Sequence, residues 1–101
     1  MAVVNGDDIG WALPAFDADA ALVQLKRALR DLKLGERGDG FELRGKAVLR
    51  LKVEDGAIAA LLAQRPALTP TWERRQLRSA AEQRKLLDEL ERRLRRWQDE
   101  D

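Results

Sequence analysis

The sequence predicts a small α+β domain in which two amphipathic helices pack on one face of a three-stranded antiparallel meander, in the order α-β-β-β-α. Three observations predict this two-layer fold. Apolar and charged residues alternate over positions 41–54, an Asp-Gly pair follows at once, and apolar residues recur every three or four positions near both ends. The 101 residues suffice for one domain with one core. We expect this domain over residues 17–97, after an extended N-terminal arm (1–16) and before an acidic C-terminal tail (98–101).

The N-terminal arm shows no helical or strand periodicity, yet it carries the large apolar residues Ile9, Trp11 and Leu13. Its glycines, aspartates and Pro14 are typical of loops. We expect the arm to place Trp11 on the core, and docking of the arm on a partner is the alternative.

The first helix is predicted to follow Asp17 or Asp19, either of which can serve as its N-cap. Gly35 is the expected C′ residue at its end. The spacing of the apolar residues is that of a helix with one buried face. This stripe consists of Ala18, Leu22, Leu25, Leu29 and Leu32, with Ala21 and Ala28 beside it.

A long hairpin forms the predicted centre of the fold. One face of residues 41–54 is apolar, and on the other face Val48 is the single apolar residue among charged ones. Asp55-Gly56 favours a type I′ turn, after which residues 57–63 pair back, with Leu49 opposite Leu62 and Val48 opposite Ala63. Gly45 is interpreted as a bulge within one strand. The alternative is a tight turn at Arg44-Gly45 that divides the strand in two. The apolar face comprises Phe41, Leu43, Ala47, Leu49, Leu51 and Val53.

The second half of the chain contains one ambiguous segment. Two X-Pro pairs make residues 65–70 a connector. Residues 71–78 fit either a strand or a helix starting at Pro70. We favour the strand because residues 79–82, Ser-Ala-Ala-Glu, form a capping box that starts the next helix at Ala80. The apolar stripe of that helix consists of Ala80, Leu87, Leu90, Leu94 and Trp97, with Gln83 on the same face.

The composition excludes several classes of function. The chain has no cysteine, histidine or tyrosine, which removes disulfides, thiolate metal sites and the usual general base. We therefore expect no enzyme, no catalytic residue, no cofactor and no metal. Neither a signal peptide nor an apolar run of membrane-spanning length is present, so we expect a cytoplasmic protein without a membrane partner. Arginine outnumbers lysine 14 to 5, and with abundant alanine and leucine this is typical of a GC-rich bacterial genome.

The favoured functional hypothesis is a small binding domain that recognises another protein, with a homodimer as one option. Its candidate interface is the apolar strip on the charged side of the hairpin, formed by Val48, Leu61 and Ala63, together with Trp97 on the last helix. The simplest explanation of this strip is that lysine and arginine stems cover it within the monomer.

The alternative is a nucleic-acid-binding module that uses the basic face of the sheet. Residues 41–79 hold eight basic and four acidic residues, although the net charge of the whole chain is only +1. The candidate anion-binding residues are Lys46, Arg50, Lys52, Arg74 and Arg78.

Overall fold

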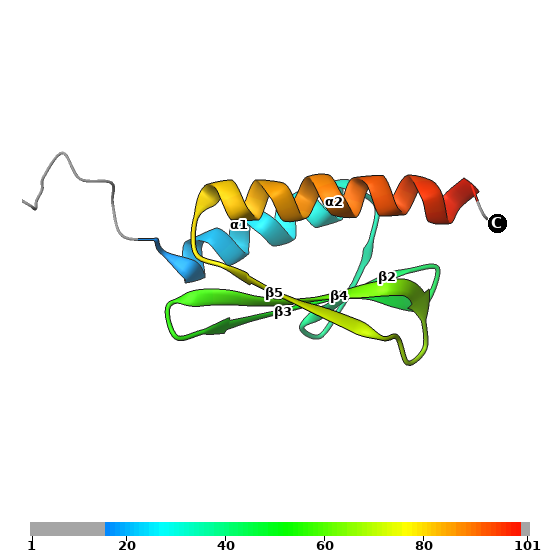
Figure 1. Ribbon diagram of the computed structural model, residues 1–101, viewed down its shortest axis with the longest axis horizontal. Helices are drawn as coiled ribbons and strands as arrows, with labels where there is room; N and C mark the ends of the chain where they lie inside the picture. The colour runs from blue at the N-terminus through cyan, green and yellow to red at the C-terminus, as the bar shows by residue number, and fades with distance from the viewer. Residues whose placement is uncertain (1–15, 100–101) are drawn as a thin grey trace, which may run out of the picture.

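The computed structural model describes residues 16–99, which form two layers (Figure 1). Helices α1 (Ala18–Asp31) and α2 (Ala80–Asp99) lie on one face of a five-stranded antiparallel sheet, so the α+β class is confirmed and the expected number of three strands is wrong. The strands are paired in sequence order, and each is joined to the next by a short connection. They are β1 (Gly35–Arg37), β2 (Gly40–Leu43), β3 (Lys46–Glu54), β4 (Ala57–Ala67) and β5 (Trp72–Leu77).

The N-terminal arm falls, except for Phe16, outside the described residues. Phe16 is partly buried and packs against the core. Trp11 lies outside the described residues.

The division of the predicted first strand into β2 and β3 confirms the alternative interpretation of Gly45. Arg44 and Gly45 have φ angles of 54° and 81°, as in a two-residue type I′ turn, and Leu43 faces Lys46 across it. Such a turn pairs odd-numbered with even-numbered residues. A bulge between Phe41 and Glu42 then restores the parity, so that Phe41 faces Leu49. The alternation of apolar and charged residues therefore continues through the turn, and the sequence has the pattern of one uninterrupted strand.

The hairpin at Asp55-Gly56 is confirmed, with φ angles of 53° and 73° at its two turn residues. The expected pairing of Leu49 with Leu62 is also present, but the register then breaks and Ala47 pairs with Ala67. Extra residues of β4 bulge out at this break, including Pro66, whose missing N–H is tolerated there.

Two expectations at this break are wrong. Val48 does not pair with Ala63, because the register shifts before Val48 is reached; it is fully buried as part of the hydrophobic core. The connector at residues 65–70 is shorter than predicted, because β4 continues through Pro66 to Ala67.

The predicted first helix is confirmed, with a correction at its end. Asp17 is the N-cap and accepts a hydrogen bond from the backbone N–H of Ala20 at 3.1 Å. Lys33, and not Gly35, adopts the left-handed conformation after the helix, with φ 69°. Leu34 follows it into the core, and Gly35 is free to begin β1.

The last helix begins at Ala80 as predicted, and the strand interpretation of residues 71–78 is confirmed by β5. The hydroxyl of Ser79 accepts from the N–H of Glu82 at 3.2 Å, while the carboxylate of Glu82 accepts from Arg78 N–H at 2.7 Å. The predicted tail begins inside this helix, which extends to Asp99. The sequence pattern missed Leu86, which is buried.

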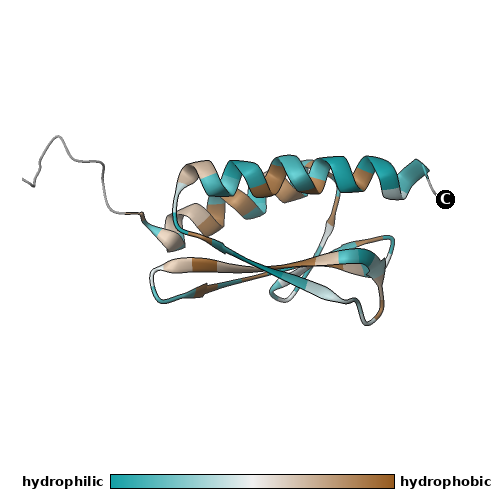
Figure 2. Ribbon diagram, viewed as in Figure 1, coloured by the Kyte–Doolittle hydropathy of each residue, from teal (hydrophilic) through white to brown (hydrophobic). Residues whose placement is uncertain are grey.

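The core lies between the helices and the sheet. In Figure 2 the hydrophobic residues of α2 turn inward and its outer side is hydrophilic. All fully inaccessible large side chains are apolar, and no polar or charged residue among residues 16–99 is buried to the same degree. The largest are Phe41, Leu25, Leu29, Leu49, Ile58, Leu62, Leu90 and Val48.

Candidate functional site

The open face of the sheet carries part of the predicted basic surface, with its charge largely compensated. Arg50 and Arg74 flank Leu61 in one cross-strand row. Arg50 pairs with Asp39 at 3.2 Å, and Arg74 pairs with Glu54 at 2.9 Å. The two arginines therefore present a row of alternating charge, which attracts a polyanion less than an unpaired basic row would.

The other predicted anion-binding residues are also exposed, and Lys52 lies in the neighbouring row of the same face, which continues through Ala59 to Gln76. Lys46 lies at the start of β3, and the guanidinium of Arg78 donates to the side chain of Gln76 at 3.0 Å. Lys52 lies beside Ala59, which is only 7% exposed although no helix covers that face. Long polar stems thus cover the small apolar residues of the open face.

Three of the four candidate interface residues are enclosed within the domain. Val48 and Ala63 are inaccessible, and Trp97 is 4% exposed and packs in the core. Leu61 is partly exposed between its two arginine neighbours. The sequence-based set therefore does not form one exposed apolar surface in the described part of the chain.

A different site, which sequence reasoning missed, lies on the helix-covered side between β5 and α2. Three hollows of about 250, 360 and 530 Å³ follow one another along this boundary. The first and second share Glu89, and the second and third share Arg93 and Arg96. We call this row of hollows the β5–α2 groove.

Four charged side chains join β5 to α2 across the middle of the groove. Glu73 and Arg75 come from β5, and Glu89 and Arg93 come from α2. Arg75 contacts Glu73 at 3.1 Å and Glu89 at 3.2 Å, while Arg93 contacts Glu73 at 3.0 Å and also pairs with Glu89. These residues form a closed, neutral ring that we call the ion quartet.

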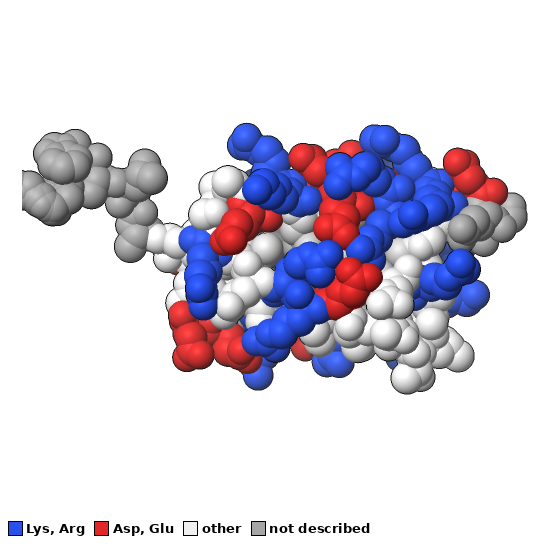
Figure 3. All heavy atoms as spheres, viewed as in Figure 1, with Lys and Arg blue, Asp and Glu red and all other residues white. Residues whose placement is uncertain are grey.

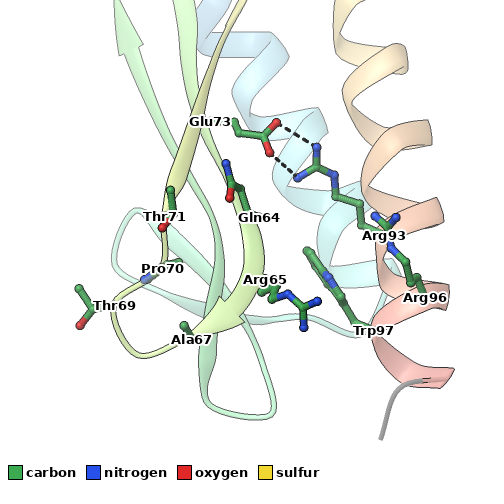
Figure 4. Close-up of a pocket in the computed structure, with 10 residues that line it drawn as sticks. All are labelled: Gln64, Arg65, Ala67, Thr69, Pro70, Thr71, Glu73, Arg93, Arg96 and Trp97. Carbon is green, nitrogen blue, oxygen red and sulfur yellow. Dashed lines mark hydrogen bonds and ion pairs between the residues drawn. The ribbon is translucent and has the colours of Figure 1, made fainter.

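Arg93 is the most enclosed member of the quartet, with 12% of its side chain exposed. Its guanidinium binds both carboxylate oxygens of Glu73 (Figure 4) and also donates to the backbone carbonyl of Ala63 at 3.0 Å. Ala63 lies at the register break of β4, so Arg93 satisfies a carbonyl where the β3–β4 pairing is interrupted.

The quartet shifts the pKa values of two of its members. The hydrogen bond from Arg93 lowers the pKa of Glu73 below its ordinary value of 4.5, partial burial opposes this, and Arg75 adds to the lowering. Burial disfavours the charged form of Arg93, but the hydrogen bonds and charges of Glu73 and Glu89 outweigh it and raise the pKa of Arg93. Both residues are therefore ionised near neutral pH.

The largest hollow, at the end of the groove, is the arginine cleft. We define it by Arg65 from β4, Thr71 before β5, and Arg93, Arg96 and Trp97 from α2. In Figure 4 the side chain of Arg65 extends from its strand toward Trp97, and Arg96 stands beside Arg93.

Guanidinium groups outnumber carboxylates in the lining of the cleft. Its lining contains three guanidinium groups, of Arg65, Arg93 and Arg96, and one carboxylate, of Glu73. In Figure 3 the surface over α2 and β5 is rich in lysine and arginine, with acidic residues interspersed among them. Arg93 and Glu73 are already paired within the ion quartet, and Arg96 adds a guanidinium group that favours an anionic ligand.

The donors around the cleft suit a carboxylate or phosphate oxygen. Guanidinium groups bind such anions in a bidentate manner, and the Gln64 amide and Thr71 hydroxyl supply further donors. Among residues 16–99, no group of three or more histidine, cysteine, aspartate or glutamate side chains is arranged to hold a metal ion. Over the same residues, no helix is both long and apolar enough to span a bilayer.

One signal in the sequence could have indicated this site. Glu73 and Arg75 lie on the same face of β5 as Leu77, which is buried beneath the helices. Charged residues on a helix-covered face need charged partners on the covering helix. Arg93 lies four residues before the buried Trp97 and so has the spacing of such a partner.

No protein-family description matches the chain, and no curated protein or solved structure shows significant similarity to it.

Proposed function

We propose that the chain is a small, non-enzymatic binding domain that captures an acidic segment of a partner protein in the arginine cleft. The convergence of three guanidinium groups on a hollow of about 530 Å³ with one carboxylate supports this function. Aspartate and glutamate side chains of a bound segment would receive charge-assisted hydrogen bonds from guanidinium groups of the cleft.

Binding of a protein in the cleft is favoured over binding of nucleic acid by the low net charge and by the burial of the aromatic residue that lines the cleft. The net charge of +1 gives little long-range attraction for a polyanion. Trp97 is buried in the core and offers no open ring on which a base could stack. The cleft has room for a few side chains rather than for a track of phosphates.

A binding role is favoured over catalysis by the groups that line the cleft. Its hydroxyls belong to Thr69 and Thr71, and no histidine or other neutral-pH base stands beside them. The carboxylate of Glu73 is held by Arg93 and has a lowered pKa, which makes it a weak proton acceptor. The lining therefore suits recognition of charge.

The test is a titration of isotope-labelled protein with three probes, namely oligoglutamate, oligolysine and single-stranded oligothymidylate, followed by NMR chemical shifts. We expect oligoglutamate to shift the signals of Gln64, Thr71 and Arg96, and oligolysine to shift none of them. Tighter binding of oligothymidylate than of oligoglutamate would favour the nucleic-acid alternative. The absence of any shift at millimolar oligoglutamate would refute the proposal.

A matched pair of arginines on α2 separates a built site from general charge. Arg96→Glu reverses a charge within the cleft, whereas Arg95→Glu reverses an exposed charge that does not line it. We expect Arg96→Glu to weaken oligoglutamate binding by about tenfold or more, because it replaces a donor with a repelling carboxylate. Equal weakening by both variants would show that net charge alone causes binding.

A further inference from the structure

We propose that the bound segment adds to the free edge of β5 as a sixth strand of the sheet. This inference rests on the proposed function and names the form and chemistry of the partner: an extended segment that carries an acidic and an apolar side chain four positions apart. The acidic side chain enters the arginine cleft, and the apolar one enters the hollow at the opposite end of the β5–α2 groove.

The edge of β5 is available for strand pairing. β5 is last in the sheet order, and no other strand of the described chain pairs with its outer edge. The N–H of Gln64 donates to the carbonyl of Thr71 at 3.0 Å, which shows that the backbone carbonyl of Thr71 points toward β4. Because ladder bonds alternate along an antiparallel strand, the backbone groups of Trp72, Arg74 and Gln76 point away from β4.

The spacing of the groove matches that of an added strand. The arginine cleft lies beside Glu73, and the smallest hollow lies beside Leu77, four residues farther along β5. At about 3.3 Å per residue, these two positions are roughly 13 Å apart. Side chains of an added strand alternate between faces, so residues four positions apart both face the groove and reach its two ends.

The two ends of the groove select different side chains. Leu77 and Leu86, each 3% exposed, form an apolar floor in the smallest hollow, whose lining otherwise consists of polar and charged side chains: Arg75, Gln76, Glu82, Lys85 and Glu89. An apolar side chain fits this floor, and an acidic side chain fits the arginine cleft. The ion quartet fills the space between them, so the intervening groove-facing residue of the partner is small.

The charges of β5 favour a foreign acidic segment over a second copy of this chain. A twofold axis through Arg74 would bring Arg74 of both copies face to face in the edge pairing. Like charges directly opposite one another destabilise such a pair, and charged edge strands are a common protection against self-association. An acidic segment would avoid this contact between like charges, and its acidic side chain would reach Arg96 in the arginine cleft.

Hydrogen exchange of backbone amides tests strand addition directly. The probe is a synthetic peptide of about ten residues, enough to span β5, with one leucine and one glutamate four positions apart among serines and threonines. We expect saturation with this peptide to slow exchange at Trp72, Arg74 and Gln76 by about tenfold or more, because the peptide backbone occupies these amides. Binding without such protection would overturn strand addition and leave the proposed function intact.

Methylation of the peptide backbone provides a matched control that needs no protein variant. N-methyl groups on the peptide residues whose amides face β5 should abolish binding, whereas the same number on the residues facing away should not. Equal effects of both sets would contradict the proposal. Light scattering could instead show that the free protein is a dimer, with these β5 amides already protected from exchange. A second copy of the chain would then occupy the edge of β5, and the proposal would be overturned.

Failure of the two proposals can be distinguished. If neither this peptide nor oligoglutamate binds, the proposed function fails. If oligoglutamate shifts the cleft residues but the peptide gives no protection of the β5 edge, only strand addition fails.

Discussion

Replacing Arg93 with methionine should destabilise the domain by removing one guanidinium group from the boundary between sheet and helix. Methionine keeps a long flexible stem in a position that is mostly enclosed, so the loss of packing is small. The carbonyl of Ala63, a fully buried residue, would lose the hydrogen bond that it accepts from Arg93. The carboxylates of Glu73 and Glu89 would retain only Arg75 between them.

The expected loss in the free energy of unfolding is about 2 kcal/mol, the middle of the range for a buried acceptor without a donor. For a domain of this size, such a loss lowers Tm by roughly 10 °C. Urea denaturation measures it directly. Far-UV circular dichroism reports the helices, and tryptophan fluorescence reports the three tryptophans together, of which Trp97 lies in the core next to the quartet.

Arg95→Met is the matched control on the same helix. Arg95 is 74% exposed and contacts Glu91 at 3.9 Å, a helical pair that contributes only a few tenths of a kcal/mol. If Arg93→Met lost no more stability than Arg95→Met, the reasoning that the quartet joins α2 to the sheet would be refuted.

Three further predictions concern pH, the second hairpin and the open face. Since the pKa of Glu73 is lowered in the folded state, its carboxylate stabilises the fold above about pH 4.5, and this stabilisation is lost as the pH falls through the lowered pKa. The melting temperatures of the wild type and of Glu73→Gln should therefore differ at pH 7 and converge in strong acid. Gly45→Ala should cost about 1 kcal/mol in thermal unfolding because φ there is 81°, and an unchanged Tm would contradict the two-residue turn. We expect no mobility shift of nucleic acid by the wild type at low salt, since acidic residues compensate the open face; a shift that Arg50→Glu with Lys52→Glu abolishes would instead favour the nucleic-acid alternative.

Elements determined by local chemistry could be predicted from the sequence. Asp17 and Ser79 mark the starts of both helices, and Asp55-Gly56 marks the central hairpin, because each acts through its own backbone neighbours. The turn at Arg44-Gly45 was only an alternative interpretation. The bulge beside Phe41 restored the alternation and so removed the change of parity that would have revealed this turn.

The arginine cleft could not be predicted in the same way, because it depends on a long-range irregularity. The register break after Leu62 extends β4 and places Arg65 opposite the end of α2. Nothing in the pattern of apolar residues encodes the size of this bulge, although Pro66 marks its position. The charges of Glu73 and Arg93 were each visible, but their meeting depends on how the helix crosses the sheet.

The sequential order of the sheet has a consequence for synthesis of the protein. Every strand pairs with its immediate neighbours in the chain, so the sheet can form progressively as it emerges from the ribosome. α1 is made first, yet its buried leucines find partners only when β3, β4 and α2 have followed. A nascent chain that stops before α2 would therefore leave the inner surface of its sheet partly uncovered, and this is the stage at which aggregation threatens it most.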